Sequence, residues 1–315
     1  MITMKKKLSS LKEGKEEFIA DCKIRNLAKG TISIYEEDFN YFIKYTNENY
    51  PELDIQNDLN KDIVTEFVIE MQENGLKTST INIRLRSIRC ALYYFMKNGY
   101  INNEFKIEQI KEEKGIPELY TKAEIQKLLK KPNLKTCTFA EYRAWAVINF
   151  FVATGVRRRS LINVKIQDLD FENDLIYIRV TKNRKTLVLP MGKTLKKVLL
   201  EYLRYRSGED NDYLFCNLEE KQLTKDALNN IIKKYNLKRG VKKTGVHLFR
   251  HYFAKEYIQN GGNALKLQKL LGHSSLEQTQ RYVDLFGQDL QVDFDKYNPL
   301  DQICVSNERI KMRVS

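Results

Sequence analysis

Long apolar runs and paired cysteines are both missing from this chain of 315 residues. No stretch approaches the roughly 18 apolar residues that a membrane-spanning helix needs, and the lysine-rich start lacks the apolar segment of a signal peptide. The five cysteines, an odd number without a CxxC pair, argue for reduced thiols rather than a disulfide framework. We therefore expect a cytoplasmic protein with no membrane contact.

Histidine is scarce too, because the chain has only three, all between positions 247 and 273. His247 and His251 have the spacing of two zinc ligands on one helix, but the segment HLFRH lacks the glutamate of the hydrolytic HExxH motif. We therefore expect no metal site. The clustering of all three histidines in one stretch favours a shared role instead.

Charge is plentiful and unbalanced. With 54 Lys and Arg against 41 Asp and Glu, the formal net charge is +13, which attracts polyanions such as DNA. A hydrophobic content of 42% and an aromatic content of 11% suffice for a sizeable core, so intrinsic disorder is excluded for most of the chain. The length favours two domains.

Residues 11–105 show helical patterning throughout. Thr31 and Asn60 are candidate N-caps, and Gly75 is a candidate helix end. The sharpest pattern is an apolar stripe at helical spacing, formed by Ile81, Leu85, Ile88, Leu92 and Phe95. Asn98 and Gly99 then end this helix. We expect a small helical bundle.

Basic side chains alternate with this apolar stripe. One interpretation is a core helix with a solvated basic face, and the other is a helix laid on DNA with its arginines on phosphates. The sequence leaves both open. If the helix binds DNA, the expected contacts are Lys77, Thr78, Arg84, Arg86 and Arg89.

The second half begins after a polar, charge-mixed segment over residues 106–118, which we interpret as an interdomain linker. Thr121 and Glu124 have the spacing of a capping box. A helix is expected over 142–152, two strands over 176–180 and 186–189, and mainly helix after residue 193. A helix over 247–259 and a helix end at Gly272 complete the pattern.

Six residues of this half carry the chemistry. Each has an ordinary alternative, because an Arg after a Gly turn is usually a solvated or capping charge and one tyrosine among eighteen is more often packing than a nucleophile. Together they supply fixed positive charge, proton donors and one nucleophile, the set needed to break a phosphodiester without a metal. They are Arg157, Lys182, His247, Arg250, His273 and Tyr282.

In their order and spacing these residues resemble the tyrosine recombinase (phage integrase and Xer) family, over roughly residues 10–287. ATGVR resembles the family's first-arginine motif, HLFRH its HxxR box, and LGHSS, with Tyr282 nine residues after His273, its terminal motif. Lys182 lies where the family has its catalytic lysine. One departure is Ser160, because the family usually carries an acidic residue three positions after the first arginine.

The resemblance implies a fold that is mainly α with a small β-sheet, in a helical DNA-binding domain and an α+β catalytic domain. The parts we expect are a basic tail over 1–10, a core-binding (SAM-like) domain over 11–105, the linker over 106–118, the catalytic domain over 119–287, and a tail over 288–315. That last tail either docks on a neighbouring protomer or frays. We expect no additional arm-type domain before the first helix.

Physical chemistry explains these residue types. Arg157 and Arg250 suit the non-bridging phosphate oxygens, because guanidinium charge favours a pentavalent transition state. Lys182, with Lys185 as the alternative, can protonate the leaving 5′-oxygen, a contribution of about 10²–10⁴-fold. Tyr282 would attack phosphorus and form a 3′-phosphotyrosine that conserves the bond energy, so no ATP and no cofactor are expected.

Other roles follow from the resemblance alone. It implies that His247 assists proton movement at the tyrosine, that His273 hydrogen-bonds a phosphate oxygen, and that Lys185 also contacts DNA. His251, which directly follows the second arginine, is expected to point elsewhere.

The resemblance also implies a site-specific recombinase that acts on double-stranded DNA sites through a Holliday junction. It would be a homotetramer on DNA and a monomer or dimer when free, with an accessory directionality factor as a further partner. Mobile-element integration and excision is the role we expect, and Xer-type dimer resolution and DNA inversion are the alternatives. A type IB topoisomerase, a catalytically decayed DNA-binding regulator and a metal-dependent nuclease are the competing classes.

Overall fold

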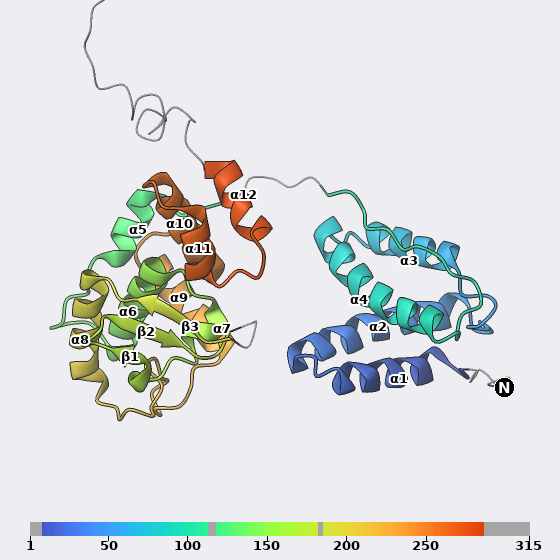
Figure 1. Cartoon of the computed structure of the whole chain (residues 1–315), viewed down its shortest axis with the longest axis horizontal. Coiled ribbons are helices and arrows are strands. Elements are labelled where there is room, and N and C mark those ends of the chain that lie inside the picture. The colour runs from blue at the N-terminus through green and yellow to red at the C-terminus, as the bar shows by residue number, and fades with distance from the viewer. Residues whose placement is uncertain (1–7, 113–117, 182–184, 287–315) are drawn as a thin grey trace, which may run out of the picture. The chain divides into compact units, whose positions relative to one another are not determined.

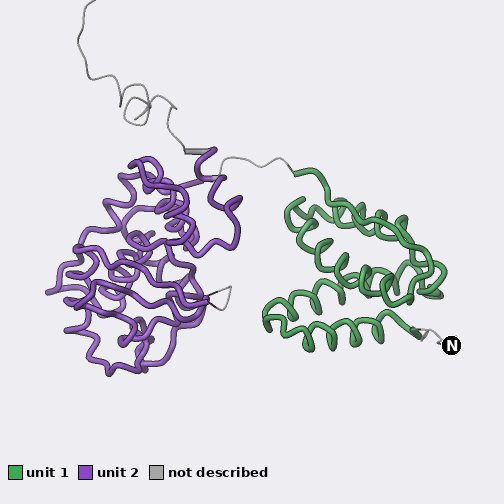
Figure 2. Tube along the Cα trace, viewed as in Figure 1, with its two compact units in different colours: residues 1–115 green, residues 116–315 purple. Residues whose placement is uncertain are grey.

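The computed structural model describes residues 8–112, 118–181 and 185–286 (Figure 1). The chain forms two compact units, residues 1–115 and 116–315, and each has its own hydrophobic core (Figure 2). Lys182, most of the basic tail over 1–10 and the C-terminal tail over 288–315 lie outside the described residues.

Unit 1 contains the helices α1 (Leu11–Ile24), α2 (Lys29–Asn49), α3 (Lys61–Glu73) and α4 (Thr78–Lys97). Asn60 caps α3 as predicted, because its side-chain oxygen accepts from the backbone N–H groups of Asp62 and Ile63. The predicted cap at Thr31 is wrong. The residue before α2 is Ala28, which has no capping side chain, and Thr31 lies within the first turn.

The core of unit 1 lies against α4, which packs on α1, α2 and α3. The predicted apolar stripe is confirmed, since all five of its side chains are buried. Phe39 of α2 meets Phe95 of α4 edge-on, with 5.7 Å between ring centroids. The helix ends as expected, with Asn98 as its C-cap and Gly99 at a φ of 71°.

The first part of the expected linker belongs to unit 1. Ile107 is buried in the unit 1 core, and the Asn82 side chain of α4 hydrogen-bonds both the N–H and the carbonyl of Ile110, each at 2.9 Å. Residues 107–110 are therefore attached to the bundle. Residues 113–117 lie outside the described part of the chain.

Unit 2 is built around α6 (Phe139–Thr154), which is buried on nearly all sides. Helices α5 (Lys122–Leu129), α8 (Lys193–Arg206), α9 (Lys225–Lys238) and α10 (Val246–Gln259) all pack against it. The predicted capping box of α5 is confirmed, with Thr121 and Glu124 bonding each other's backbone N–H groups. A helix with apolar residues on nearly all faces is buried in the core of a domain.

A small antiparallel sheet completes unit 2, with the strand order β1 (Leu169–Asp170), β2 (Leu175–Ile178), β3 (Leu187–Pro190) and the pairing Ile176↔Leu189. A short 3₁₀ helix, η1 (Ile166–Asp168), precedes it. The two longer strands lie close to their predicted positions, whereas β1 was not predicted. Helices α11 (Ala264–Leu271) and α12 (Glu277–Phe286) pack on α10 and on each other.

Both units are thus mainly helical, and the sheet is confined to unit 2, as the sequence predicted. Within the described ranges, no helix is both long and apolar enough to cross a membrane.

Candidate active site

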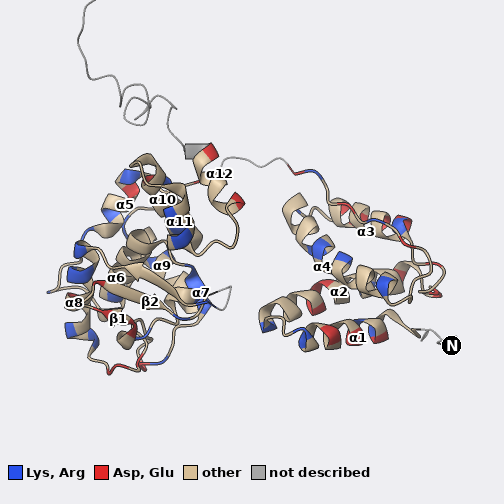
Figure 3. Ribbon diagram, viewed as in Figure 1, with Lys and Arg blue, Asp and Glu red and all other residues tan. Residues whose placement is uncertain are grey.

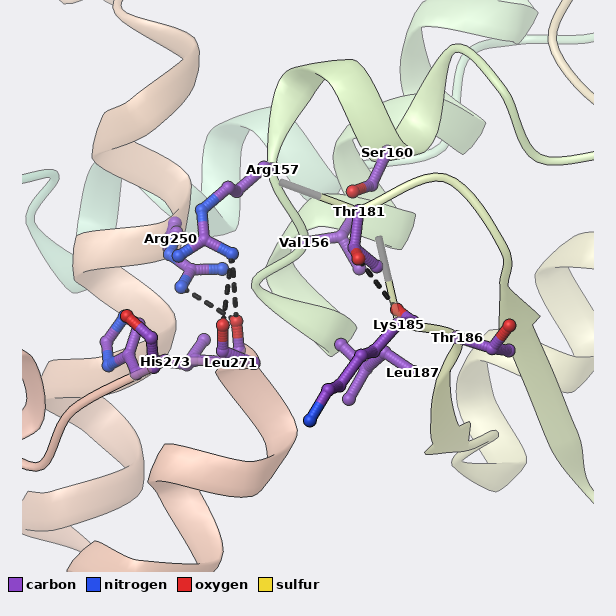
Figure 4. Close-up of a pocket in the computed structure, with 12 residues that line it drawn as sticks. Val156, Arg157, Ser160, Thr181, Lys185, Thr186, Leu187, Arg250, Leu271 and His273 are labelled. Atoms are coloured by element: carbon purple, nitrogen blue, oxygen red, sulfur yellow. Dashed lines mark hydrogen bonds between the residues drawn. The ribbon is translucent and has the colours of Figure 1, made fainter. Parts of the chain in front are cut away.

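A cavity of about 450 Å³ opens in unit 2 where the turn after α6, the β2–β3 hairpin, α10 and the end of α11 meet (Figure 4). Of the six candidate catalytic residues, Arg157, Arg250 and His273 line it. Its other polar lining residues are Ser160, Thr181, Lys185, Thr186 and Ser274. Three candidates that are far apart in the sequence therefore come together at one pocket.

Arg250 is held by backbone carbonyls. Its two terminal nitrogens donate to the carbonyl oxygens of Gly155 and Leu271, each at 2.9 Å, and the side chain is buried. Each terminal nitrogen of Arg250 carries a second N–H group, so two donors remain to hydrogen-bond an anion in the pocket. Burial, together with the nearby charge of Arg157, lowers the pKa of Arg250 to about 9.

Arg157 lies beside Arg250 and approaches one of the same carbonyls, that of Leu271 (Figure 4). It is the N-cap residue of the short helix α7 (Arg158–Leu161), and its Nη1 lies 3.4 Å from the carbonyl oxygen of Leu271 and 3.3 Å from that of Gly272. Burial lowers the pKa of Arg157 as well. Among the described residues, no carboxylate forms an ion pair with Arg157 or Arg250. Two poorly solvated, unneutralised cations favour a bound anion.

Two glycines make this arrangement possible. Gly155 ends α6 at a φ of 61°, and a Cβ there would lie 2.6 Å from Phe253 and 2.9 Å from Leu271. Gly272 ends α11 at a φ of 60°, as predicted from the sequence. Glycine adopts this left-handed conformation most readily because it has no Cβ, and the turn leaves the last carbonyls of α11 facing the arginines.

His273 follows that turn and lines the pocket. Its Nδ1 lies 2.8 Å from the hydroxyl oxygen of Thr279, which fixes the ring. Burial, together with the charges of Arg250 and Arg157, lowers the pKa of His273 to about 4. The imidazole is therefore neutral at physiological pH.

Tyr282 lies on α12, beside the pocket rather than in its lining. It is 9% exposed, and its ring is parallel to that of His273, with 6.4 Å between centroids. Its hydroxyl lies 2.8 Å from Nδ1 of His251. A phenolate at Tyr282 would raise the pKa of both arginines, so the hydroxyl is within electrostatic reach of the pocket.

The expectation that His251 points elsewhere is therefore wrong, because this side chain contacts the tyrosine hydroxyl. His247, one turn earlier on α10, is exposed, and its side chain makes no hydrogen bond within the described part of the chain. Successive residues of a helix point in directions about 100° apart, so Arg250 can enter the pocket while His251 meets α12. The sequence shows the spacing of these residues along the helix, but it does not show that one side of α10 faces the pocket and another faces α12.

Ser160, the departure from the family pattern, supports the hairpin rather than an arginine. Its hydroxyl donates to the carbonyl of Val180 at 2.9 Å. Arg158 does not line the pocket, and its Nη1 donates to the side-chain oxygen of Asn229 at 3.0 Å. Lys182 lies outside the described residues, but Lys185 lines the cavity, and its backbone carbonyl accepts from the Thr181 hydroxyl at 2.6 Å.

The predicted DNA contacts of α4 do not form one uniform set. Lys77 and Arg86 are exposed, while Thr78 and Arg89 are half-buried. Arg84 is engaged within the bundle, because its guanidinium lies 4.0 Å from the ring centroid of Tyr41 and 3.9 Å from a carboxylate oxygen of Asp38. Arg84 therefore has partners inside unit 1, and its contact with DNA stays a prediction. Figure 3 shows basic residues on α4 and, in unit 2, on α7 and α11.

Comparison with known proteins identifies the family. The sequence model of the Phage integrase family matches residues 118–288, more than half of the chain. The chain belongs to the phage integrase family. It is a tyrosine recombinase, an enzyme that cleaves and rejoins DNA at specific sites.

Several relatives match this phage integrase family member along most of their length. It is 28% identical to tyrosine recombinase XerD of Listeria monocytogenes serovar 1/2a (strain ATCC BAA-679 / EGD-e) over 284 residues, 87% of this chain and 94% of that protein. It is 27% identical to tyrosine recombinase XerA of Pyrococcus furiosus (strain ATCC 43587 / DSM 3638 / JCM 8422 / Vc1) over 292 residues, 91% of this chain and 95% of that one.

Solved structures share the fold. A lambda integrase dimer bound to a COC′ core site gives a TM-score of 0.70 at 16% identity, covering 90% of this chain and 79% of that chain. The Tn1549 transposon integrase with transposon right end DNA gives 0.69 at 19% identity, covering 85% and 94%. These matches show that this chain has the same fold as the two integrases.

Proposed function

We propose that this recombinase cuts DNA through a 3′-phosphotyrosine intermediate formed by Tyr282. The observation that carries the proposal is the pair of carbonyl-held guanidiniums, Arg157 and Arg250, in a pocket beside that tyrosine. A phosphodiester is an anion whose charge increases in the pentavalent transition state, so two cations with spare N–H donors stabilise it selectively.

The other candidates take supporting roles in this proposal. His273, neutral and fixed by Thr279, hydrogen-bonds a phosphate oxygen. Lys182, on the hairpin between β2 and β3, protonates the leaving 5′-oxygen, and Lys185 contacts the DNA backbone. His247, which lies on α10 one turn before Arg250 and within electrostatic reach of Arg157, assists proton movement at the tyrosine. Energy stored in the phosphotyrosyl bond lets a 5′-hydroxyl rejoin the strand without ATP.

At the level of assembly, we propose that four protomers hold two sites and exchange strands through a Holliday junction. Full-length similarity to proteins named XerD and XerA favours chromosome-dimer resolution of the Xer type. The structural likeness to a transposon integrase fits integration and excision of a mobile element, the role expected from the sequence. Once covalent trapping has located the cleavage site, two plasmid substrates distinguish these roles. Resolution is tested on a plasmid with two direct copies of the site, and integration on a plasmid with one copy together with a fragment that carries an element end.

Covalent trapping tests the chemistry. Nicked duplexes from the DNA flanking the gene are incubated with the protein in chelator, denatured and run on a gel. We expect an adduct with the wild type and none with Tyr282→Phe, while duplex binding is retained. Tyr257→Phe is the matched control, because it removes a hydroxyl from the same small apolar cluster and should leave the adduct intact.

Each competing class predicts a different result in this assay. Binding without any wild-type adduct would favour the decayed regulator, and cutting that stops in chelator would favour the nuclease. Relaxation of every supercoiled plasmid regardless of sequence would favour the topoisomerase. An adduct formed by Tyr282→Phe would contradict the assignment of the nucleophile.

A further inference from the structure

The hydroxyl of Tyr282 faces a nitrogen that the six-residue motif does not include. Its oxygen is 2.8 Å from Nδ1 of His251, with the two rings inclined at 45° and 5.7 Å between their centroids. This is the length of a good hydrogen bond. The nucleophile therefore has a proton partner before any DNA is bound.

His251 is held in the state that can accept a proton. Burial, together with the charges of His247 and Arg250 on the same helix, lowers its pKa, so the imidazole is neutral at physiological pH. A neutral imidazole has one N–H and one acceptor nitrogen. With the ring proton on Nε2, Nδ1 presents its lone pair to the phenol.

The other two histidines are placed less well for this task. Nδ1 of His273 is paired with the Thr279 hydroxyl, and its ring lines the pocket where the phosphate would bind. His247 is exposed and has no hydrogen bond to Tyr282 in the part of the chain that the structure describes. The geometry separates a histidine that faces the anion pocket from a histidine that faces the nucleophile.

We propose that His251 is the base for Tyr282, accepting its hydroxyl proton as the oxygen attacks phosphorus. This proposal rests on the proposed phosphotyrosine chemistry. The O–H bond of Tyr282 breaks and a proton moves to Nδ1, giving an imidazolium, while the new bond from oxygen to phosphorus forms. The bond from phosphorus to the 5′-oxygen breaks, and that oxygen takes a proton from a separate acid, for which Lys182 is the candidate.

Rejoining runs the same steps backwards. The 5′-hydroxyl attacks the phosphotyrosine and its proton returns to the acid. The phenolate of Tyr282 leaves and recovers its proton from the His251 imidazolium. Each ring returns to its starting protonation state after one cycle, so no external acid or base is consumed.

The test compares three variants on the duplex that the wild type captures covalently. His251→Asn keeps an acceptor oxygen close to the position of Nδ1 but cannot take up a proton. His251→Ala removes the group altogether. His247→Asn is the comparison variant, because it makes the same change at the histidine of the HxxR motif, one turn earlier on the same helix, and so shows which of the two histidines matters more for the tyrosine. Thermal unfolding and duplex binding confirm that each variant is folded.

Two substrates separate the base from the acid. One is the natural phosphodiester and the other carries a 5′-bridging sulfur, which leaves without being protonated. We expect His251→Asn and His251→Ala to lower the single-turnover rate of adduct formation by about 10²–10⁴-fold on both substrates. A Lys182→Ala variant should be slow on the phosphodiester and largely restored on the sulfur substrate.

Each result decides the question. If His251→Asn forms adduct at the wild-type rate, or regains that rate with the sulfur substrate, His251 is not the base. A larger unrestored loss in His247→Asn than in His251→Asn would also overturn the proposal. If the wild type itself forms no adduct, the phosphotyrosine function fails, and that result is distinct from a failure confined to His251.

Discussion

Arg157 and Arg250 donate to the same carbonyl oxygen, that of Leu271, over 3.4 and 2.9 Å. One arginine precedes α7 and the other lies within α10, so the end of α11 is the common point that positions both. Like charges repel, and shared acceptors offset part of that repulsion. The pocket is therefore held ready for an anion by backbone rather than by carboxylates.

The first prediction concerns this shared carbonyl. Arg250→Lys keeps the charge, but a single ammonium cannot span the carbonyls of Gly155 and Leu271 and still face the pocket. We expect the single-turnover rate of adduct formation to fall by about 10²–10³-fold, the loss typical for one transition-state donor. Duplex affinity should change far less. Arg204→Lys, an exposed change on α8, serves as the control and should behave as wild type.

The second prediction concerns Ser160. Ser160→Ala removes the hydrogen bond to Val180 and leaves that carbonyl without this donor. We expect the free energy of unfolding of the catalytic unit to fall by about 1 kcal/mol, measured by denaturant titration of the full chain. Adduct formation should also slow, because the Val180 end of the hairpin leads to Lys182. An unchanged unfolding midpoint together with an unchanged rate would show that the bond has no supporting role.

The third prediction separates two arginines of α4. Arg86 is exposed, so Arg86→Ala should weaken duplex binding and lower the slope of log K against log salt by about one unit. Its unfolding midpoint should stay close to the wild-type value. Arg84→Ala should do the reverse, because it removes the contact with Tyr41 and leaves Asp38 without its cation.

A calorimetric scan and a salt titration of both variants check this contrast. If Arg84→Ala lowers the salt slope and leaves the unfolding temperature unchanged, its role inside the bundle is refuted. If Arg86→Ala leaves the slope unchanged, this face of α4 does not lie on DNA.

The fourth prediction concerns pH. The pKa of His273 is lowered to about 4, and burial with nearby positive charge also lowers the pKa of His251. In an unfolded chain the pKa of histidine is about 6.5. Between these values the unfolded chain binds protons that the folded chain does not, so stability falls as the pH drops from about 6.5 towards 4.

Urea titrations of the DNA-free protein between about pH 7 and pH 5 measure this slope. This window lies above the range in which most carboxylates titrate. His273→Asn cannot be protonated and should flatten part of the slope, whereas a variant with an undiminished slope would mean that His273 does not remain neutral in the fold.

Much of the fold could be predicted from local signals. Asn60, Thr121 and the stripe on α4 were all located correctly, because a cap or an apolar periodicity is a property of neighbouring residues. The start of α2 was missed, because Ala28 gives no capping signal and Thr31 resembles a cap from within the first turn. β1 has only two residues, too few to show an alternating pattern.

The sequence predicted which residues form the site, but it did not predict the hydrogen bonds that hold them together. The motif indicated Arg157 and Arg250, yet nothing in the sequence shows that both would bind the carbonyl of Leu271. That contact depends on the direction of a backbone group at a left-handed turn. The link between His251 and Tyr282 joins residues 31 positions apart and depends on the packing of α10 against α12.

Chain order has a further consequence, because Tyr282 lies on α12, after both arginines and all three histidines. Translation proceeds from the N-terminus, so the bundle of unit 1 and most of unit 2 leave the ribosome before Tyr282 does. In the chemistry that we propose, an unfinished chain would therefore lack its nucleophile, and only a polypeptide completed through α12 would be able to break a strand.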